Sequence, residues 1–402
     1  MSWARRGAPT LIVRADGLQC VSKKGPQMSA HQPLSGIKVL DFSTLLPGPL
    51  AGLMLAEAGA EVLKIERPGS GEDMRHYVPK WGRDAVGFHL LNRGKKSLAI
   101  NLKDRQQLAL LEPLLREADV ILEQFRPGVM DRLGLGYAAI KAINPKIIYC
   151  SITGYGQTGP KVDVAGHDLN YVGDAGLLAL SMGDPQKPSL PPVLAADLAG
   201  GTYPAVVNIL MALLAREKTG EGSHLDISMT DNLFMLMTWA LGQGMLKGDW
   251  PKPSAERLTG GSARYHIYPT SDGRHVAAAP LEDRFWAVFC DLIELPEALR
   301  DDERDPEATL EACRAIIASR PAEEWRRAFF GQDCCCSIVQ SLQDAMADPN
   351  IHARGLFQHV VTNEEGEELP ALPVAVAPQF RRPSEEPQHA PALGANNDEY
   401  LS

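Results

Sequence analysis

Residues 37–66 read IKVLDFSTLLPGPLAGLMLAEAGAEVLKIE, and this stretch decides the fold. Its two ends, residues 37–42 and 61–66, are short apolar runs of the kind that form β-strands. Residues 50–58 between them are rich in alanine, leucine and methionine, which favour a helix, and Gly59 is a typical helix stop. The stretch therefore predicts a strand–helix–strand unit, the building block of parallel sheets.

The same alternation of strands and helices continues along the chain. An amphipathic helix is predicted at residues 105–117, with Pro113 as a candidate break. Four further strands are predicted at residues 97–101, 120–123, 146–151 and 223–228. We therefore expect an α/β fold with an open, Rossmann-like parallel sheet. The first strand–helix turn, Leu46-Pro47-Gly48-Pro49, lacks the pattern G-x-G-x-x-G, which argues against a dinucleotide-dependent dehydrogenase.

The second half of the chain has a different pattern of predicted elements, with apolar helices, a linker and a hairpin. Residues 202–215, after Gly200-Gly201, predict a long apolar helix, and residues 231–242 are apolar on nearly all faces, which predicts a buried helix. Residues 247–262 contain prolines and a glycine pair and predict a linker. A hairpin within residues 265–279 then begins a smaller α+β domain. Its helices are expected to begin at Asp283, Pro306, Pro321 and Ser341.

These patterns divide the chain into four segments. We expect a leader at residues 1–32, a large α/β domain at 33–246, a small domain at 247–345 and a C-terminal segment at 346–402 that returns to the large domain. The leader is basic, with Asp16 as the only acid before Met28. We interpret it as disordered or as a start-site artefact, and mitochondrial import is the less favoured alternative.

The composition excludes several classes of protein. The chain has 45% hydrophobic and 22% charged residues and a net charge of −10, so no nucleic-acid partner is expected. No uninterrupted apolar run reaches the roughly 18 residues of a membrane span, so no membrane partner is expected. The seven cysteines form no C-x-x-C pair and no Cys/His spacing, which predicts no metal site. Reduced thiols predict a cytoplasmic location.

Three segments carry side chains suited to proton transfer. His167 and Asp168 follow a glycine-rich turn at residues 154–160, Asp197 lies among small residues at a helix start, and Glu282 follows a predicted strand. Each has an ordinary structural explanation as well: a packed histidine, a helix N-cap and a helix start. Spacing alone therefore leaves the roles of these residues open.

Several phrases resemble the family III CoA-transferases and α-methylacyl-CoA racemases over residues 33–380. They are PLSGIKVL at 33–40, GAEVLKIERP at 59–68, RPGV at 126–129 leading to LGLG at 133–136, SITGYGQTGP at 151–160 and KTGEG at 218–222. The resemblance implies an acyl-CoA substrate, a large domain that binds CoA, and two chains threaded through one another as an interlocked homodimer. It implies no cofactor apart from the coenzyme A of the substrate.

The resemblance also assigns candidate CoA contacts. They are Arg67, Lys103, Arg126, Arg132, Gly166 and Tyr171. Arginine is suited to phosphate because its guanidinium offers paired donors. Backbone N–H groups near residues 166–168 are candidate donors to an enolate oxygen.

The resemblance offers two chemistries. In a racemase, His167 and Asp197 would flank the α-carbon and Glu282 would support His167. In a transferase, Asp168 would attack the acyl-CoA and form a mixed anhydride and then an enzyme–CoA thioester. All three racemase positions are filled, so we favour racemase or epimerase activity on a 2-methyl-branched acyl-CoA. CoA transfer between carboxylic acids is the alternative.

Two phrases depart from the racemase pattern. The racemases have Glu-Pro where this chain has Glu282-Asp283-Arg284, and Gly-Ala-Pro where it has Gly261-Ser262-Ala263-Arg264-Tyr265. Asp283-Arg284 is closer to the transferases. Two other classes are less favoured. A non-enzymatic CoA-binding protein would need no acid/base set, and a thiol enzyme using Cys334, Cys335 and Cys336 lacks a base nearby in sequence.

Overall fold

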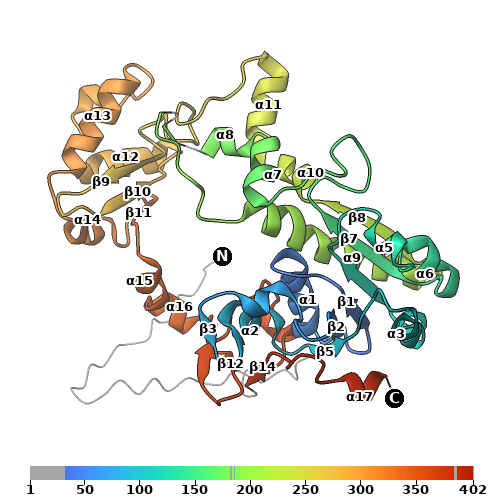
Figure 1. Cartoon of the computed structure of the whole chain (residues 1–402). Helices are drawn as coiled ribbons and strands as arrows, with labels where there is room; N and C mark the ends of the chain where they lie inside the picture. The colour runs from blue at the N-terminus through green and yellow to red at the C-terminus, as the bar shows by residue number, and fades with distance from the viewer. Residues whose placement is uncertain (1–31, 182, 185, 384–386, 402) are drawn as a thin grey trace, which may run out of the picture.

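The computed structural model describes residues 32–401 except 182, 185 and 384–386. The leader predicted at residues 1–32 therefore lies almost entirely outside the described residues. The described chain forms a large α/β sheet structure, with a smaller group of helices and strands set apart from it at the upper left of Figure 1.

The large sheet has six parallel strands in the order β5-β2-β1-β6-β7-β8. The strands are β1 (Lys38–Asp41), β2 (Glu61–Glu66), β5 (Lys96–Ala99), β6 (Val120–Glu123), β7 (Ile148–Thr153) and β8 (Ser223–Ser228). The predicted parallel α/β sheet is thereby confirmed. Strands β2 and β5 follow β1 in sequence and lie on one side of it. The chain then crosses over, and β6, β7 and β8 are added on the other side of β1. Such a reversal leaves a crevice at the carboxyl ends of the two strands, where open α/β sheets bind ligands.

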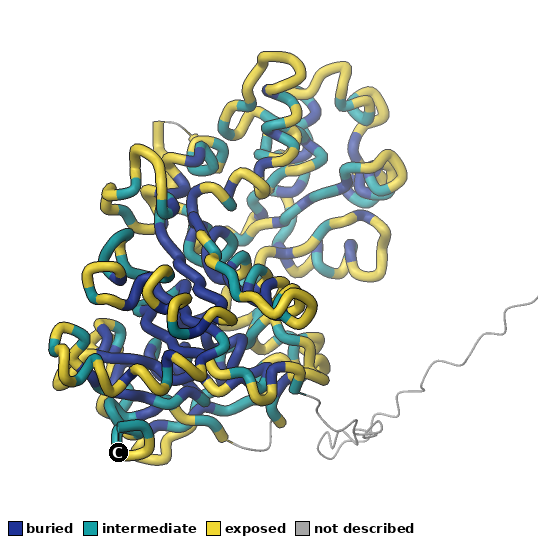
Figure 2. Tube along the Cα trace, turned by 90° about the vertical axis from the view of Figure 1, so that its right-hand side faces the viewer, coloured by how far each residue is buried: buried dark blue, intermediate teal, exposed yellow. Residues whose placement is uncertain are grey.

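Helices cover both faces of this sheet, because successive residues of a strand point to opposite sides. Val39 belongs to a core that includes α1 (Pro47–Glu57) and α9 (Tyr203–Thr219). Its neighbour Leu40 belongs to the opposite core, which includes α4 (Glu112–Glu117) and α6 (Tyr137–Ile143). Figure 2 shows the resulting buried centre in dark blue.

The predicted helix at residues 105–117 is divided. It consists of α3 (Arg105–Leu110) and α4, which meet at Leu111. Pro113 lies in the first turn of α4, where a proline is tolerated because its missing N–H has no helical partner. The proline therefore starts a second helix.

The smaller group has its own sheet and core. Strands β9 (His266–Pro269), β10 (His275–Ala278) and β11 (Cys336–Ile338) form an antiparallel sheet in the order β11-β10-β9. Helices α12 (Asp283–Ile293), α13 (Pro306–Ile317) and α14 (Ala322–Phe329) pack on it. We call this group the small lobe. Tyr268, Phe289 and Trp325 are fully buried at its centre.

The C-terminal segment leads back to the large sheet (Figure 1). Helices α15 (Leu342–Met346) and α16 (Pro349–Ala353) precede a small sheet of β12 (Val360–Thr362), β13 (Glu368–Pro370) and β14 (Gln388–His389). Helix α17 (Asn397–Tyr400) then lies beside β5, where the Asn396 N–H donates to the Ser97 carbonyl at 3.0 Å.

The helix predicted to be buried at residues 231–242 is only half buried, so that prediction was wrong for the single chain. The segment forms α10 (Met229–Leu233), η3 (Phe234–Met237) and α11 (Thr238–Lys247). Leu233 and Met237 face the core, whereas Met235 is 68% and Leu246 is 83% exposed. The segment is apolar all round because one side packs on the core, and the other side is a large uncovered apolar surface.

One further helix is unusually long and apolar. Within the described residues, Ala196–Thr219 alone has the length and composition of a membrane span. It consists of a π-helical segment η2 (Ala196–Thr202) followed by α9, and no charged side chain lies between Leu198 and Ala215. Ala205, Ile209 and Leu213 on one face of α9 are buried in the core of the large sheet.

Candidate active site

A cavity of about 460 Å³ opens at the crevice between β1 and β6. Thr44 and Leu45 line it after β1, Gln124 and Arg126 line it after β6, and Gly154 lines it after β7. Of the ten residues named as candidate site residues above, Arg126, Gly166, His167, Tyr171 and Asp197 also line this cavity.

His167 stands at the start of α7 (Asp168–Asp174). Its backbone is extended there, and its N–H donates to Asn170 Oδ1 at 3.0 Å, which closes the helix start. The side chain is exposed and faces the cavity, so the ring is accessible to a ligand.

Glycines on either side of Tyr171 shape the wall beside His167. A Cβ atom at Gly166 would lie 2.7 Å from the Tyr171 ring, and one at Gly154 would lie 2.4 Å from it. The Tyr171 hydroxyl donates to the Gly166 carbonyl at 2.5 Å. Burial and the nearby Asp197 raise the pKa of Tyr171, so the hydroxyl keeps its proton for this bond.

Asp197 lies on the π-helical segment η2. Segments of this kind are rare and occur often at functional sites. The small residues around Asp197 are explained by close packing, because a Cβ atom at Gly200 would lie 2.2 Å from the Met229 carbonyl oxygen. Burial, and then the negative charge of Asp168, raise the pKa of Asp197 to about 6, although His167 opposes them. Asp197 can therefore carry a proton near neutral pH.

Asp168 has a different place from its neighbour. Its side chain is buried, and its Oδ1 accepts hydrogen bonds from the N–H groups of Ala196 at 2.7 Å and Asp197 at 3.0 Å. It is not among the described residues that line the cavity. Asp168 thus caps η2 and fixes the backbone that carries Asp197.

Glu282 does not join these residues within the single chain. It is exposed at the start of α12 in the small lobe, where it lines a separate cavity of about 660 Å³. Arg264 lines the same cavity and pairs with Asp283 at 2.6 Å and Asp302 at 2.7 Å. Arg264 belongs to one of the two phrases that depart from the racemase pattern, residues 261–265, and Asp283 belongs to the other, residues 282–284. The ion pair between them joins the two departures in the structure.

The other basic candidates are dispersed. Lys103 and Arg132 line a neighbouring cavity of about 770 Å³, and Arg67 is exposed and pairs with Asp73 at 2.5 Å. Only Arg126 of the four lies at the cavity that holds His167.

A buried network of charges lies behind the cavity, and sequence reasoning missed it. Lys95 pairs with Asp41 at 2.9 Å, and both side chains are fully buried. Burial alone would raise the pKa of Asp41, but Lys95 and Lys64 lower it to about 2. Burial lowers the pKa of Lys95 to about 8. The signal that could have revealed the network is the presence of Asp41 and Lys64 inside otherwise apolar strands.

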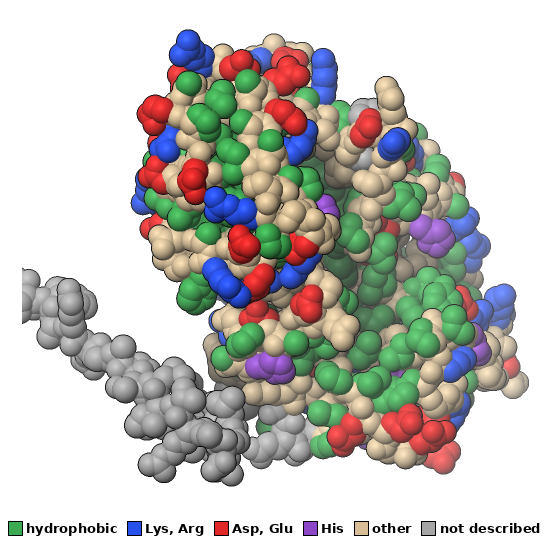
Figure 3. All heavy atoms as spheres, turned by 90° about the vertical axis from the view of Figure 1, so that its left-hand side faces the viewer, with side chains coloured by type: hydrophobic (Ala, Val, Ile, Leu, Met, Phe, Trp, Pro, Cys, Tyr) green, Lys and Arg blue, Asp and Glu red, His purple; other side chains and the backbone are tan. Residues whose placement is uncertain are grey.

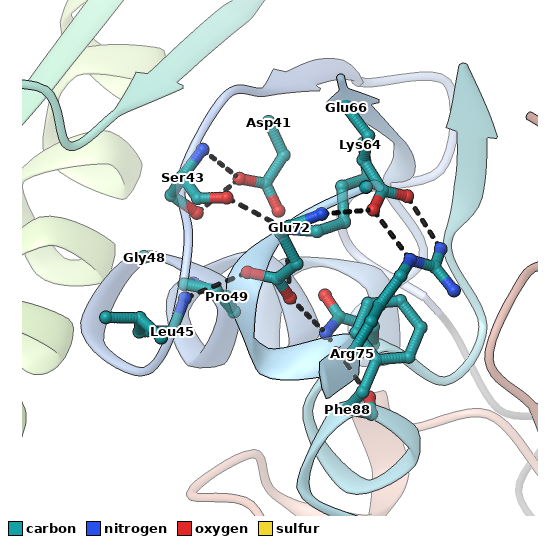
Figure 4. Close-up of polar contacts among 12 residues, drawn as sticks. Asp41, Ser43, Leu45, Gly48, Pro49, Lys64, Glu66, Glu72, Arg75 and Phe88 are labelled. Atoms are coloured by element: carbon teal, nitrogen blue, oxygen red, sulfur yellow. Dashed lines mark hydrogen bonds and ion pairs between the residues drawn. The ribbon is translucent and has the colours of Figure 1, made fainter. Parts of the chain in front are cut away.

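A second part of this network surrounds Arg75, which Figure 4 shows beside Glu66 and Phe88. The guanidinium binds Glu66 at 2.7 Å and Asp84 at 2.8 Å, and lies 3.7 Å from the centre of the Phe88 ring. Every one of these charges has a partner, which a buried charge requires.

The site is suited to proton transfer, because a histidine and a carboxylic acid of raised pKa share one cavity. Within the described residues, no group of three or more His, Cys, Asp or Glu side chains is arranged to hold a metal ion.

Known proteins with both expected activities are similar to this chain. A succinate–glutarate CoA-transferase from Agrobacterium fabrum is 32% identical over 92% of this chain and 95% of its own length. The human α-methylacyl-CoA racemase is also 32% identical, over 92% of each chain. The crystal structure of a CAIB/BAIF family protein from Brucella suis superposes with a TM-score of 0.75 at 28% identity, covering 91% of this chain and 98% of that one. The sequence pattern of CoA-transferase family III matches residues 34–397, so this chain is an enzyme of CoA-transferase family III.

Proposed function

We propose that the protein is an acyl-CoA racemase or epimerase that removes and returns the α-proton of a 2-methyl-branched acyl-CoA. One observation carries the proposal. His167 and Asp197 line the same cavity. Asp168, the nucleophile that a transferase would need, is not among the described residues that line this cavity and instead caps η2.

The chemistry requires two proton-transfer groups. His167 removes the α-proton from one face of the thioester, and the electron pair of the C–H bond moves into the carbonyl as an enolate. Asp197 then gives its proton to the other face, and the two residues exchange roles in the reverse direction. The pKa of about 6 for Asp197 suits both roles near neutrality. Backbone N–H groups near residues 166–168 are the candidate donors to the enolate oxygen.

We also propose that the enzyme works as a homodimer. Glu282 is exposed and lies in a different cavity from His167 in the same chain. The small lobe of a second copy would bring its own Glu282 to the exposed His167 ring. The uncovered apolar surface that includes Met235 and Leu246 is of the kind that subunit interfaces bury. Hydrophobic side chains also line the hollow beside the small lobe (Figure 3), and a cavity of about 510 Å³ is lined by Trp239 of α11 and Ile267 of β9.

CoA transfer between carboxylic acids is the second candidate function. The Arg264–Asp283 ion pair favours CoA transfer. Its two residues lie in the two phrases where the chain departs from the racemase pattern. Asp168 would then attack the thioester through its other carboxylate oxygen, while Oδ1 kept accepting the two backbone N–H groups.

One assay separates the two functions. The protein is incubated in deuterated water with a panel of acyl-CoAs and free carboxylic acids, and mass spectrometry reports deuterium at the α-carbon and transfer of CoA together. We expect α-deuteration and inversion of a 2-methylacyl-CoA. CoA transfer without α-deuteration, with a hydroxylamine-trapped adduct on Asp168, would overturn the racemase proposal.

A further inference from the structure

The turn between β1 and α1 contains a strained residue at the edge of the cavity. Leu45 has a φ of +64°, a left-handed conformation that side-chain-bearing residues rarely adopt. Leu45 also lines the cavity, between Thr44 and Pro47. Residues held in such conformations persist only where their surroundings fix them.

Glu72 supplies the fixing contact. Its side chain is 2% exposed, and its Oε2 accepts the Leu45 N–H at 2.9 Å (Figure 4). Its Oε1 accepts from Asn92 at 3.2 Å, and the Lys64 ammonium lies 3.6 Å away. Lys64 also donates to the Ser43 carbonyl at 2.8 Å, so the same buried pair holds the turn at two points.

The turn is in direct contact with the segment that carries Asp197. The buried Thr202 hydroxyl lies 2.9 Å from the Pro47 carbonyl oxygen and 3.2 Å from the Asp197 carbonyl oxygen, and donates to both. A Cβ atom at Gly201 would lie only 3.2 Å from the Pro47 side chain. A shift of the turn would therefore be transmitted to η2.

We propose that Glu72 is a positioning residue of the active site, which fixes Asp197 through Leu45, Pro47 and Thr202. Glu72 does not line the cavity, so it acts on the reaction only through the residues that it holds. The catalytic consequence rests on the proposed function, because it assumes that Asp197 moves a proton.

A purely structural role predicts something different. In that case, loss of the Glu72 carboxylate would lower the stability of the whole chain in the same way as loss of any buried carboxylate. Glu57 is the matched control. It is 1% exposed at the end of α1, the helix that follows the Leu45 turn, and its partners Arg93 at 2.8 Å and Arg381 at 3.4 Å do not line the cavity.

The first test compares the full chain as wild type, Glu72→Ala, Glu72→Gln and Glu57→Ala by amide hydrogen–deuterium exchange. In Glu72→Ala we expect faster exchange in the peptides covering residues 43–48 and 196–202. The amide oxygen introduced by Glu72→Gln can still accept the Leu45 N–H, so this variant should restore most of the protection, and Glu57→Ala should leave both peptides unchanged. Unchanged protection of residues 196–202 in Glu72→Ala would overturn the inference.

Kinetics of 2-methylacyl-CoA racemisation give the second readout. For Glu72→Ala we expect kcat to fall by about tenfold or more while KM changes by less than about threefold, because the turn moves Asp197 but not Arg126. An equal fall in kcat for Glu57→Ala would overturn the inference.

The Thr202 hydroxyl keeps the inference testable if Glu72→Ala does not fold. Thr202→Val removes the bridge to Pro47 without changing the volume, and Thr202→Ser keeps it. The valine variant should lose protection at residues 196–202 and lose kcat, and the serine variant should recover both. Equal behaviour of the two variants would overturn the inference. A wild type without racemase activity would overturn the proposed function instead, and the amide exchange would still decide the role of Glu72.

Discussion

Replacing Asp168 by asparagine should separate its two proposed roles. Asparagine keeps an oxygen that can accept the Ala196 and Asp197 N–H groups, so the cap on η2 is retained. It removes the negative charge that contributes to the raised pKa of Asp197. In a transferase, the same change would remove the nucleophile itself.

The size of the effect follows from the pKa of Asp197. That pKa is about 6 instead of 3.8, a difference of about two. Burial is the largest cause and the charge of Asp168 the second, while His167 opposes both. Removing the charge of Asp168 should therefore lower the pKa of Asp197 by roughly one, which corresponds to about 1.4 kcal/mol. Racemisation should therefore remain within about tenfold of wild type.

The assay is the pH dependence of kcat/KM for racemisation of a 2-methylacyl-CoA. Because the active form of the His167–Asp197 pair shares one proton, a lower pKa of Asp197 should move the acid limb to lower pH. Asp168→Ala is the companion variant, since it also removes the cap and should lose more activity. The reasoning would be refuted if Asp168→Asn folds normally but loses racemisation by about a thousandfold or more.

Three further predictions concern the site and its support. His167→Ala should lower α-proton exchange by about 10²–10⁴-fold in deuterated water, while the control His352→Ala on the exposed face of α16 should not. Gly200→Ala should cost about 1–3 kcal/mol in urea unfolding, because its Cβ would meet the Met229 carbonyl at 2.2 Å; Gly242→Ala meets nothing within 4 Å and should cost nothing. Lys95→Met should cost about 3–5 kcal/mol, because it removes the ion-pair partner of the buried Asp41. In the wild type the Asp41 pair should stabilise the chain above pH 3.8 and lose that contribution as the pH falls toward about 2, the lowered pKa of Asp41.

The sequence predicted the large sheet well because local and global preferences agree there. Strands β1, β2 and β6 are apolar runs between glycine or polar stops, and strands buried on both faces need that pattern. The break near Pro113 was predictable for the same reason, since a proline limits the backbone locally.

The remaining features depend on contacts between distant residues. The exposed side of α11 could not be distinguished from a buried one, because apolar residues face both the core and the uncovered surface. The pairing of Asp41 with Lys95 joins residues from different elements, so neither local sequence indicates it. The separation of Glu282 from His167 depends on where the small lobe lies, and no short motif encodes that position.

The π-helical segment η2 makes the place of Asp197 tolerant of a one-residue change in chain length. A π turn accommodates one residue more than an α-helix would in the same space. Deleting a single residue from η2 after Asp197 would let Ala196–Thr219 continue as regular α-helix, and the residues on either side of the deletion would keep their places relative to α9. Asp197 would then stay at the cavity although the π turn was lost. Among homologous sequences, a gap of one residue in this segment would therefore be compatible with the acid/base pair, whereas a substitution of the aspartate would mark its loss.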